Sequence, residues 1–101
     1  MTNETGQKRR TVTVRIEGRV QGVYYRAWTR DTARALGLDG WVRNMGDGSV
    51  QAVFSGPTAQ VEEMLRRCAE GPPHAEVAAV TVTDEGGAPP SGFKVLGTNW
   101  R

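Results

Sequence analysis

The chain is organised around one stretch, Gly18-Arg19-Val20-Gln21-Gly22-Val23-Tyr24-Tyr25-Arg26. An alternating apolar run precedes it and a helical pattern follows, so it predicts a turn from a strand into a helix. The first N–H groups of a helix have no partner inside the helix and suit an oxyanion, which Arg26 could clamp through two parallel hydrogen bonds. The stretch indicates an anion site, most simply for phosphate, although no Lys-Ser/Thr pair closes it as in nucleoside-triphosphate loops. A glycine-containing turn beside a surface arginine is the alternative interpretation.

A second stretch, Gly40-Trp41-Val42-Arg43-Asn44-Met45-Gly46-Asp47-Gly48-Ser49-Val50, predicts a strand, a tight turn and another strand. Asp47-Gly48 supplies the turn signal. Alternation places Asn44 on the same strand face as Val42, the face that we assign to the helices. An amide on a mostly apolar face needs hydrogen-bond partners, so Asn44 is a candidate site residue. A turn-initiating Asn is the alternative.

Together the two stretches resemble the signatures of the acylphosphatase family. Gly18 to Arg26 is similar to the pattern G-x-V-Q-G-V-x-F/Y-R, and Gly40 to Gly56 is similar to G-aromatic-V-basic-N-x-x-x-G-x-V-x-x-x-x-x-G. The resemblance implies hydrolysis of small acyl phosphates to a carboxylate and inorganic phosphate, with Arg26 and Asn44 as catalytic residues. It implies that Asn44 holds the attacking water. The phosphate-binding residues that it implies are Arg19, Val20, Gln21, Gly22, Val23 and Arg26.

The chemistry is reasonable with so few groups. A carboxylate is a good leaving group, and phosphoryl transfer of this kind needs positioning and charge stabilisation more than covalent help. Asn is no strong base, but its amide can donate to and accept from a water molecule. Because the Arg26 guanidinium could supply the cationic clamp that a metal supplies elsewhere, we expect no metal and no cofactor.

Periodicity along the chain predicts the element order β-α-β-β-α-β. This is the α+β, ferredoxin-like split βαβ sandwich, with two helices packed on one face of a four- to five-stranded antiparallel sheet. The first and third strands are the expected central pair. Strands are expected at 11–17, 40–45, 49–55 and 78–82, with a short edge strand at 93–96, and helices at 26–36 and from Gly56-Pro57-Thr58 to Gly71-Pro72-Pro73. The inner helix stripes are predicted to hold Trp28, Thr32, Ala35 and Leu36 in the first helix and Val61, Met64, Leu65 and Cys68 in the second.

The chain has 101 residues, which suits one domain. We expect a flexible N-terminal segment at 1–10 and a single acylphosphatase-like domain at 11–97. A net charge of +2 suits an anionic ligand but is too weak to argue for nucleic acid. The single cysteine, Cys68, excludes an internal disulfide, and no apolar run reaches membrane-spanning length. We therefore expect a cytoplasmic monomer with no nucleic-acid or membrane partner. The resemblance implies a small acyl phosphate as the substrate.

Two alternatives share this fold. An RNA-recognition domain would expose aromatic residues on the sheet face away from the helices. The outward positions of the first and third strands hold none: they are Thr11, Thr13, Arg15, Glu17, Gln51 and Val53. A regulatory domain could use Arg26 to bind an effector without turnover, which the fold alone does not exclude.

The remaining polar residues offer no other site. His74 is the only histidine and has no metal-ligand spacing around it, while Asp47 and Glu85 are interpreted as isolated turn carboxylates. The C-terminal stretch 93–101 lacks the basic-aromatic ending expected of the family. This departure puts in doubt the last edge strand and any contact that it makes with the site.

Overall fold

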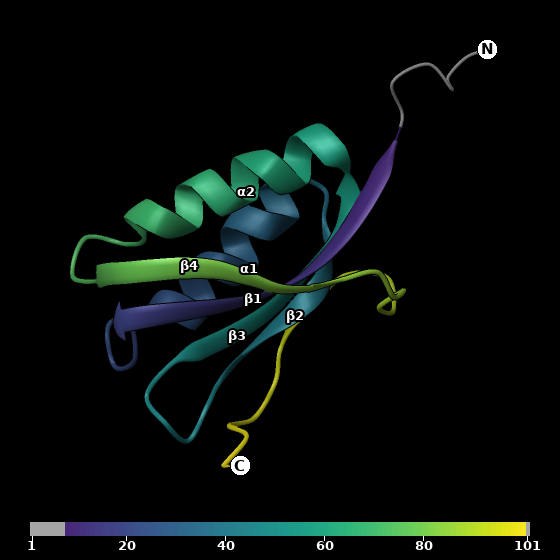
Figure 1. Ribbon diagram of the computed structural model, residues 1–101. Coiled ribbons are helices and arrows are strands. Elements are labelled where there is room, and N and C mark those ends of the chain that lie inside the picture. Colours follow the sequence, from purple (N-terminus) through teal and green to yellow (C-terminus); the bar gives the residue numbers. More distant parts are fainter. Residues whose placement is uncertain (1–7, 101) are drawn as a thin grey trace.

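A computed structural model describes residues 8–100 of the chain. Five strands and two helices follow one another as β1 (Arg9–Arg19), α1 (Tyr25–Ala35), β2 (Asp39–Asn44), β3 (Val50–Pro57), α2 (Thr58–Glu70), β4 (Glu76–Glu85) and β5 (Phe93–Val95). Both helices cover the same face of one sheet (Figure 1), so the predicted ferredoxin-like α+β fold is confirmed. Most of the segment predicted as flexible, 1–10, lies outside the described residues. Within it, Arg9 and Arg10 belong to β1 and pair with β3.

The sheet has the order β4-β1-β3-β2-β5. As predicted, β1 and β3 are the central pair, and β2 lies beside β3. β5 pairs with β2 in the parallel direction, so the prediction of an antiparallel sheet is wrong at this edge. The chain crosses from β4 on one edge of the sheet to β5 on the other and then runs in the direction of β2. Two bonds continue the pairing beyond β5, from Leu96 N to Val42 O and from Asn99 N to Asn44 O, both 2.9 Å.

The core lies between the helices and the inner face of β1 and β3. Alternate side chains of these strands are fully buried, as predicted: Val12, Val14 and Ile16 from β1, and Val50, Ala52 and Phe54 from β3. Phe93 of β5 is also buried and stacks on Phe54, with 5.7 Å between ring centroids. Burying an aromatic side chain of this size contributes about 2 kcal/mol to folding. The short edge strand therefore anchors itself through the core as well as through its ladder.

The predicted stripe of α2 is confirmed, since Val61, Met64 and Cys68 are fully buried and Leu65 packs against the core. The predicted stripe of α1 is out of phase by one residue. The fully buried residues of α1 are Tyr25, Thr29 and Ala33. Of the four residues predicted for its inner face, Trp28 and Leu36 are partly buried against the core.

Internal hydrogen bonds explain the shift in α1. The Tyr25 hydroxyl donates to the backbone carbonyl of Cys68 at 2.7 Å, and the Thr29 hydroxyl donates to the carbonyl of Tyr25 at 2.8 Å. A buried polar group is tolerated once it is hydrogen-bonded. Burial also raises the pKa of the Tyr25 phenol far above its usual value. An apolar count could not foresee that two hydroxyl side chains would face the core.

The alternation of inward and outward residues in β4 changes partway along the strand. Val80 packs against the core, but Ala78 is exposed and Val77 faces the core instead. The register between β1 and β4 shifts at Glu17/Gly18, and this irregularity reverses the alternation. At Gly18 a Cβ atom would lie 2.2 Å from the carbonyl oxygen of Glu76, so only glycine fits there. The first glycine of the motif is therefore a close-approach position in the sheet.

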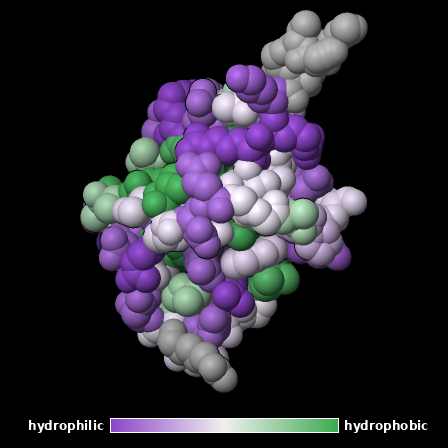
Figure 2. All heavy atoms as spheres, turned by 45° about the vertical axis from the view of Figure 1, so that its right-hand side comes forward, coloured by the Kyte–Doolittle hydropathy of each residue, from purple (hydrophilic) through white to green (hydrophobic). Residues whose placement is uncertain are grey.

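The surface in Figure 2 carries hydrophilic residues across its upper part and down its middle. Apolar residues on this face form separate groups between them. Large exposed hydrophobic side chains are few among the described residues and are spread over the chain, at Tyr24, Val82, Val95 and Trp100. Scattered apolar residues of this kind are normal for a protein surface.

Candidate active site

The loop between β1 and α1 has the geometry of an anion cradle. Gly22 and Tyr24 have φ angles of 74° and 71°, and the φ of Val23 between them is negative. When the φ angle alternates in sign from one residue to the next, successive N–H groups point into the same concave surface. None of the N–H groups of Val20 to Tyr24 donates to another backbone atom of the described chain, and the first bond of α1 is Trp28 N to Tyr24 O at 3.1 Å. The predicted strand-to-helix turn is present, and its amides are available to a ligand.

Arg26 lies beside this cradle as the second residue of α1. Its side chain is half-buried and lines a pocket of about 260 Å³. Within residues 8–100 its guanidinium has no hydrogen-bond or ion-pair partner. The pocket is lined by Val20, Gly22, Tyr24, Tyr25, Arg26, Ala27, Arg30 and Val95. Unpaired amides and an unpaired guanidinium thus share one concave surface, which suits a phosphate-sized anion.

Asn44 ends β2 on the predicted face. It pairs with Val50, while Val42 pairs with Ala52, so Asn44 and Val42 lie on the helix side of the sheet. Its side-chain Oδ1 is buried without a hydrogen-bond partner, the sole such side-chain atom in the described part of the chain. Its backbone carbonyl already accepts from Asn99 N. Because most buried polar atoms in proteins are hydrogen-bonded, this oxygen is a candidate to bind a water molecule or a ligand.

The predicted phosphate-binding residues divide into three groups. Val20, Gly22 and Arg26 line the pocket, and the Val20 side chain is buried, so that residue offers only its backbone. Arg19 is exposed at the end of β1, and Val23 is half-buried against the core. Neither lines the pocket, nor does Asn44. The side chain of Gln21 turns to the β2–β3 hairpin instead.

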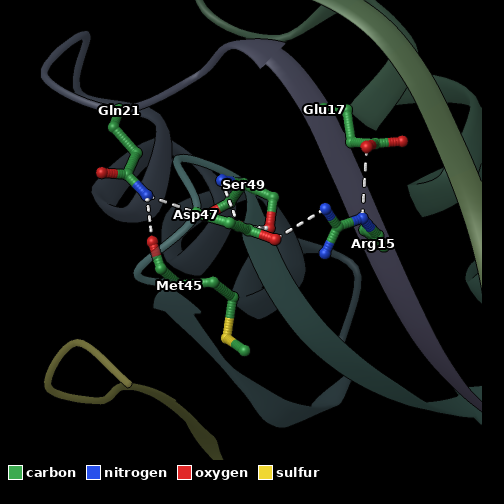
Figure 3. Close-up of polar contacts among 6 residues, drawn as sticks. All are labelled: Arg15, Glu17, Gln21, Met45, Asp47 and Ser49. Carbon is green, nitrogen blue, oxygen red and sulfur yellow. Dashed lines mark hydrogen bonds and ion pairs between the residues drawn. The ribbon is translucent and has the colours of Figure 1, made fainter. Parts of the chain in front are cut away.

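Gln21 joins the cradle to the strand that carries Asn44. Its Nε2 donates to Met45 O at 2.9 Å and to Ser49 O at 2.8 Å (Figure 3). Met45 directly follows Asn44. The loop after β1 and the end of β2 therefore lie side by side.

The hairpin has its own polar network. One carboxylate oxygen of Asp47 accepts from the Ser49 N–H at 2.9 Å and the Ser49 hydroxyl at 2.6 Å, while the other accepts from Arg15 at 2.7 Å. These bonds, those from Ser49 first, hold the pKa of Asp47 well below its usual range. Asp47 was interpreted as isolated, and that is wrong. Glu85 is likewise paired, with Arg10 at 2.9 Å.

The sequence interpretation missed five of the eight pocket residues, which are Tyr24, Tyr25, Ala27, Arg30 and Val95. Arg30 lies one turn beyond Arg26, and its position four residues along the helix was the available signal. Val95 lines the pocket from β5, the edge strand that the atypical C-terminal stretch had put in doubt. Tyr24 is 69% exposed and is the sole described residue other than glycine with a positive φ. No sequence pattern marks such a conformation in a tyrosine.

No three His, Cys, Asp or Glu residues among 8–100 are grouped as a metal site would require. The Cys68 thiol is buried, and burial raises its pKa to about 12, so it is no nucleophile. His74 is exposed in the turn between α2 and β4.

The fold and the pocket define a small ferredoxin-like α+β domain with a candidate anion site at the start of its first helix. Residues 12–95 match the sequence model of the acylphosphatase family. An acylphosphatase from Rhodospirillum rubrum is 54% identical over 84 residues, which cover 83% of this chain and 92% of that protein. The structures of an acylphosphatase from Coxiella burnetii (TM-score 0.84, 33% identity, 91% of this chain and 99% of that one) and of acylphosphatase from Bacillus subtilis (0.80, 27%, 88% and 99%) are similar. The chain belongs to the acylphosphatase family.

Proposed function

We propose that this member of the family hydrolyses small acyl phosphates to a carboxylate and inorganic phosphate without a metal ion. The observation that carries the proposal is the buried, unpaired Oδ1 of Asn44, on the strand that Gln21 ties to the anion cradle. A phosphate in the cradle would satisfy the loop amides and the Arg26 guanidinium. A water beside it would satisfy Asn44.

In the proposed reaction the phosphoryl group is held by the amides of Val20 to Val23 and by Arg26, with Arg19 adding positive potential. Asn44 accepts a hydrogen bond from the attacking water and so aims its oxygen at phosphorus. The new P–O bond forms as the bond to the acyl oxygen breaks, and the carboxylate leaves with the bonding electron pair. The proton of the water passes to a phosphate oxygen of the substrate. Arg26 and the amides stabilise the charge on the transferring group.

The alternatives are less well supported. On the outer sheet face, β1 and β3 offer no aromatic platform within the described residues; Trp41 of β2 lies there, but the Arg43 guanidinium covers its ring at 4.7 Å. A non-catalytic regulatory domain would account for Arg26 but not for the unpaired Asn44 oxygen. Neither described helix has the length and apolar character of a membrane span. We further propose a cytoplasmic monomer in which residues 11–97 act as one domain and bind no nucleic acid.

The test is hydrolysis of benzoyl phosphate by the purified protein in excess chelator, with an aryl phosphate ester as the control substrate. We expect turnover of the acyl phosphate alone, at the same rate with and without chelator. Loss of turnover in chelator would contradict the metal-free mechanism. Turnover of neither compound would favour the regulatory domain.

A further inference from the structure

The side-chain amide nitrogen of Gln21 makes two hydrogen bonds to the β2–β3 turn. Its amide nitrogen has two hydrogens, and each donates to a carbonyl of the β2–β3 turn, Met45 O at 2.9 Å and Ser49 O at 2.8 Å. These two carbonyls also close the turn itself, because Met45 N donates to Ser49 O and Gly48 N donates to Met45 O. Gln21 therefore holds the turn at the point where its two strands separate.

The same residue connects the two halves of the site. Its neighbours Val20 and Gly22 line the pocket beside Arg26, and its partner Met45 is bonded covalently to Asn44. Among the described residues, the loop makes no hydrogen bond to Asn44 itself. The separation between the anion cradle and the Asn44 amide is thus set through the Gln21 side chain.

A second contact holds the turn from the other side (Figure 3). The Ser49 hydroxyl donates to Asp47, and Asp47 accepts from Arg15 of β1, which also contacts Glu17 at 3.2 Å. β1 therefore holds the turn through Arg15, and the loop that follows β1 holds it through Gln21. With both contacts in place, the turn has little freedom to shift relative to the cradle.

We propose that Gln21 is a positioning residue for hydrolysis, whose side-chain amide fixes Asn44 at its working distance from the bound phosphoryl group. The inference rests on the proposed function. A displacement of about 1 Å at a reacting centre can lower a rate 10²-fold, so a side chain that touches no reacting atom can still control kcat.

The test compares Gln21→Met, which keeps the length of the side chain but cannot donate, with Gln51→Met as the matched control. Gln51 also uses its side chain, accepting from Arg43 at 2.9 Å, but it lies on the outer face of β3. For Gln21→Met we expect kcat to fall about tenfold, while the competitive inhibition constant of inorganic phosphate changes less than about threefold. Gln51→Met should leave both quantities at their wild-type values.

A double-mutant cycle with Asn44→Ala separates positioning from a general structural role. Because Gln21 is inferred to act through Asn44, Gln21→Met should cost less than about twofold in kcat when Asn44 is already alanine. Asp47→Ala releases the turn without changing the loop, so it should lower kcat about threefold, and less than that when Asn44 is already alanine. This variant replaces Gln21→Met in the test if Gln21→Met fails to fold. Equal losses in both backgrounds, or a loss confined to phosphate inhibition, would overturn the inference. Absence of turnover in the wild-type protein would instead refute the proposed function.

Discussion

Arg15 and Arg26 lie eleven positions apart, on the two sides of the motif loop. They differ in whether a carboxylate pairs with the guanidinium. Arg15, on the outer sheet face, contacts both Asp47 and Glu17. Arg26, at the start of α1, has no partner within the described chain. Surface ion pairs contribute roughly 0–1 kcal/mol each, so pairing a cation brings little stability. What points to an anionic ligand at Arg26 is that its free guanidinium shares one pocket with unpaired backbone amides.

The largest effect is expected where that free cation is removed. Arg26→Ala should lower kcat/KM about 10³-fold, because substrate binding and transition-state charge stabilisation are lost together. Steady-state hydrolysis of benzoyl phosphate measures the change. Arg26→Lys keeps the charge without the planar fork and should recover only part of the activity. Kinetics unchanged from wild type would remove Arg26 from the site.

A smaller loss is expected at Asn44. Asn44→Ala should reduce kcat about 10²-fold with KM little changed, since the amide is proposed to hold water and not the substrate. Initial rates over a range of substrate concentrations separate the two parameters. A variant with full turnover would show that the water is held elsewhere.

A third variant would make Arg26 resemble Arg15. Arg30→Glu places a carboxylate one helical turn from Arg26 and reverses a charge in the pocket, so kcat/KM should fall about tenfold. Arg30→Gln is the control and should lose much less. Added salt should shrink the difference between the two variants, because it screens exposed charges. Equal activity of the two variants would mean that the charge at this position is irrelevant.

The smallest effect is expected at a paired carboxylate far from the pocket. Hydrogen bonds from Arg66 and then Arg67 lower the pKa of Glu63 from 4.5 to about 2, so its carboxylate stabilises the fold above pH 4.5. That contribution is lost as the pH falls from 4.5 toward 2. Glu63→Gln should therefore flatten the decline of Tm over this range and leave hydrolysis unchanged. A wild-type acid profile in the variant would show that the pair does not affect stability.

The sequence could predict the elements whose signal is local. Alternation in β1 and β3, the stripe of α2 and the Asp47-Gly48 turn all followed from spacing, and Asn44 was assigned to the correct face. The phase of α1 could not be predicted in this way, because Tyr25 and Thr29 are buried only after finding carbonyl partners across the core and in the preceding turn. The parallel direction of β5 depends on a crossover between the two sheet edges, which no local pattern records.

The same distinction between local and long-range features applies to the candidate site. The motif located the cradle and Arg26, whose chemistry is carried by neighbouring residues. The orientation of the Gln21 side chain and the contribution of Val95 depend on segments far away in sequence, so residue types alone could not predict them.

The sheet order also determines how this chain must fold. Among residues 8–100, β2 and β3 are the sole neighbouring strands joined by a short turn, whereas β1 contacts Ser55 from Thr11 and Thr83 from Thr13, separations of 44 and 70 residues. Closing loops of that length precedes any gain from the contacts, so folding is slower than in helical bundles of the same size. The β2–β3 hairpin, whose turn begins after Asn44, has only local contacts between its two strands and can form early. The cradle at the end of β1 lies next to strand pairs of long sequence separation, so we expect enzymatic competence to appear late in refolding.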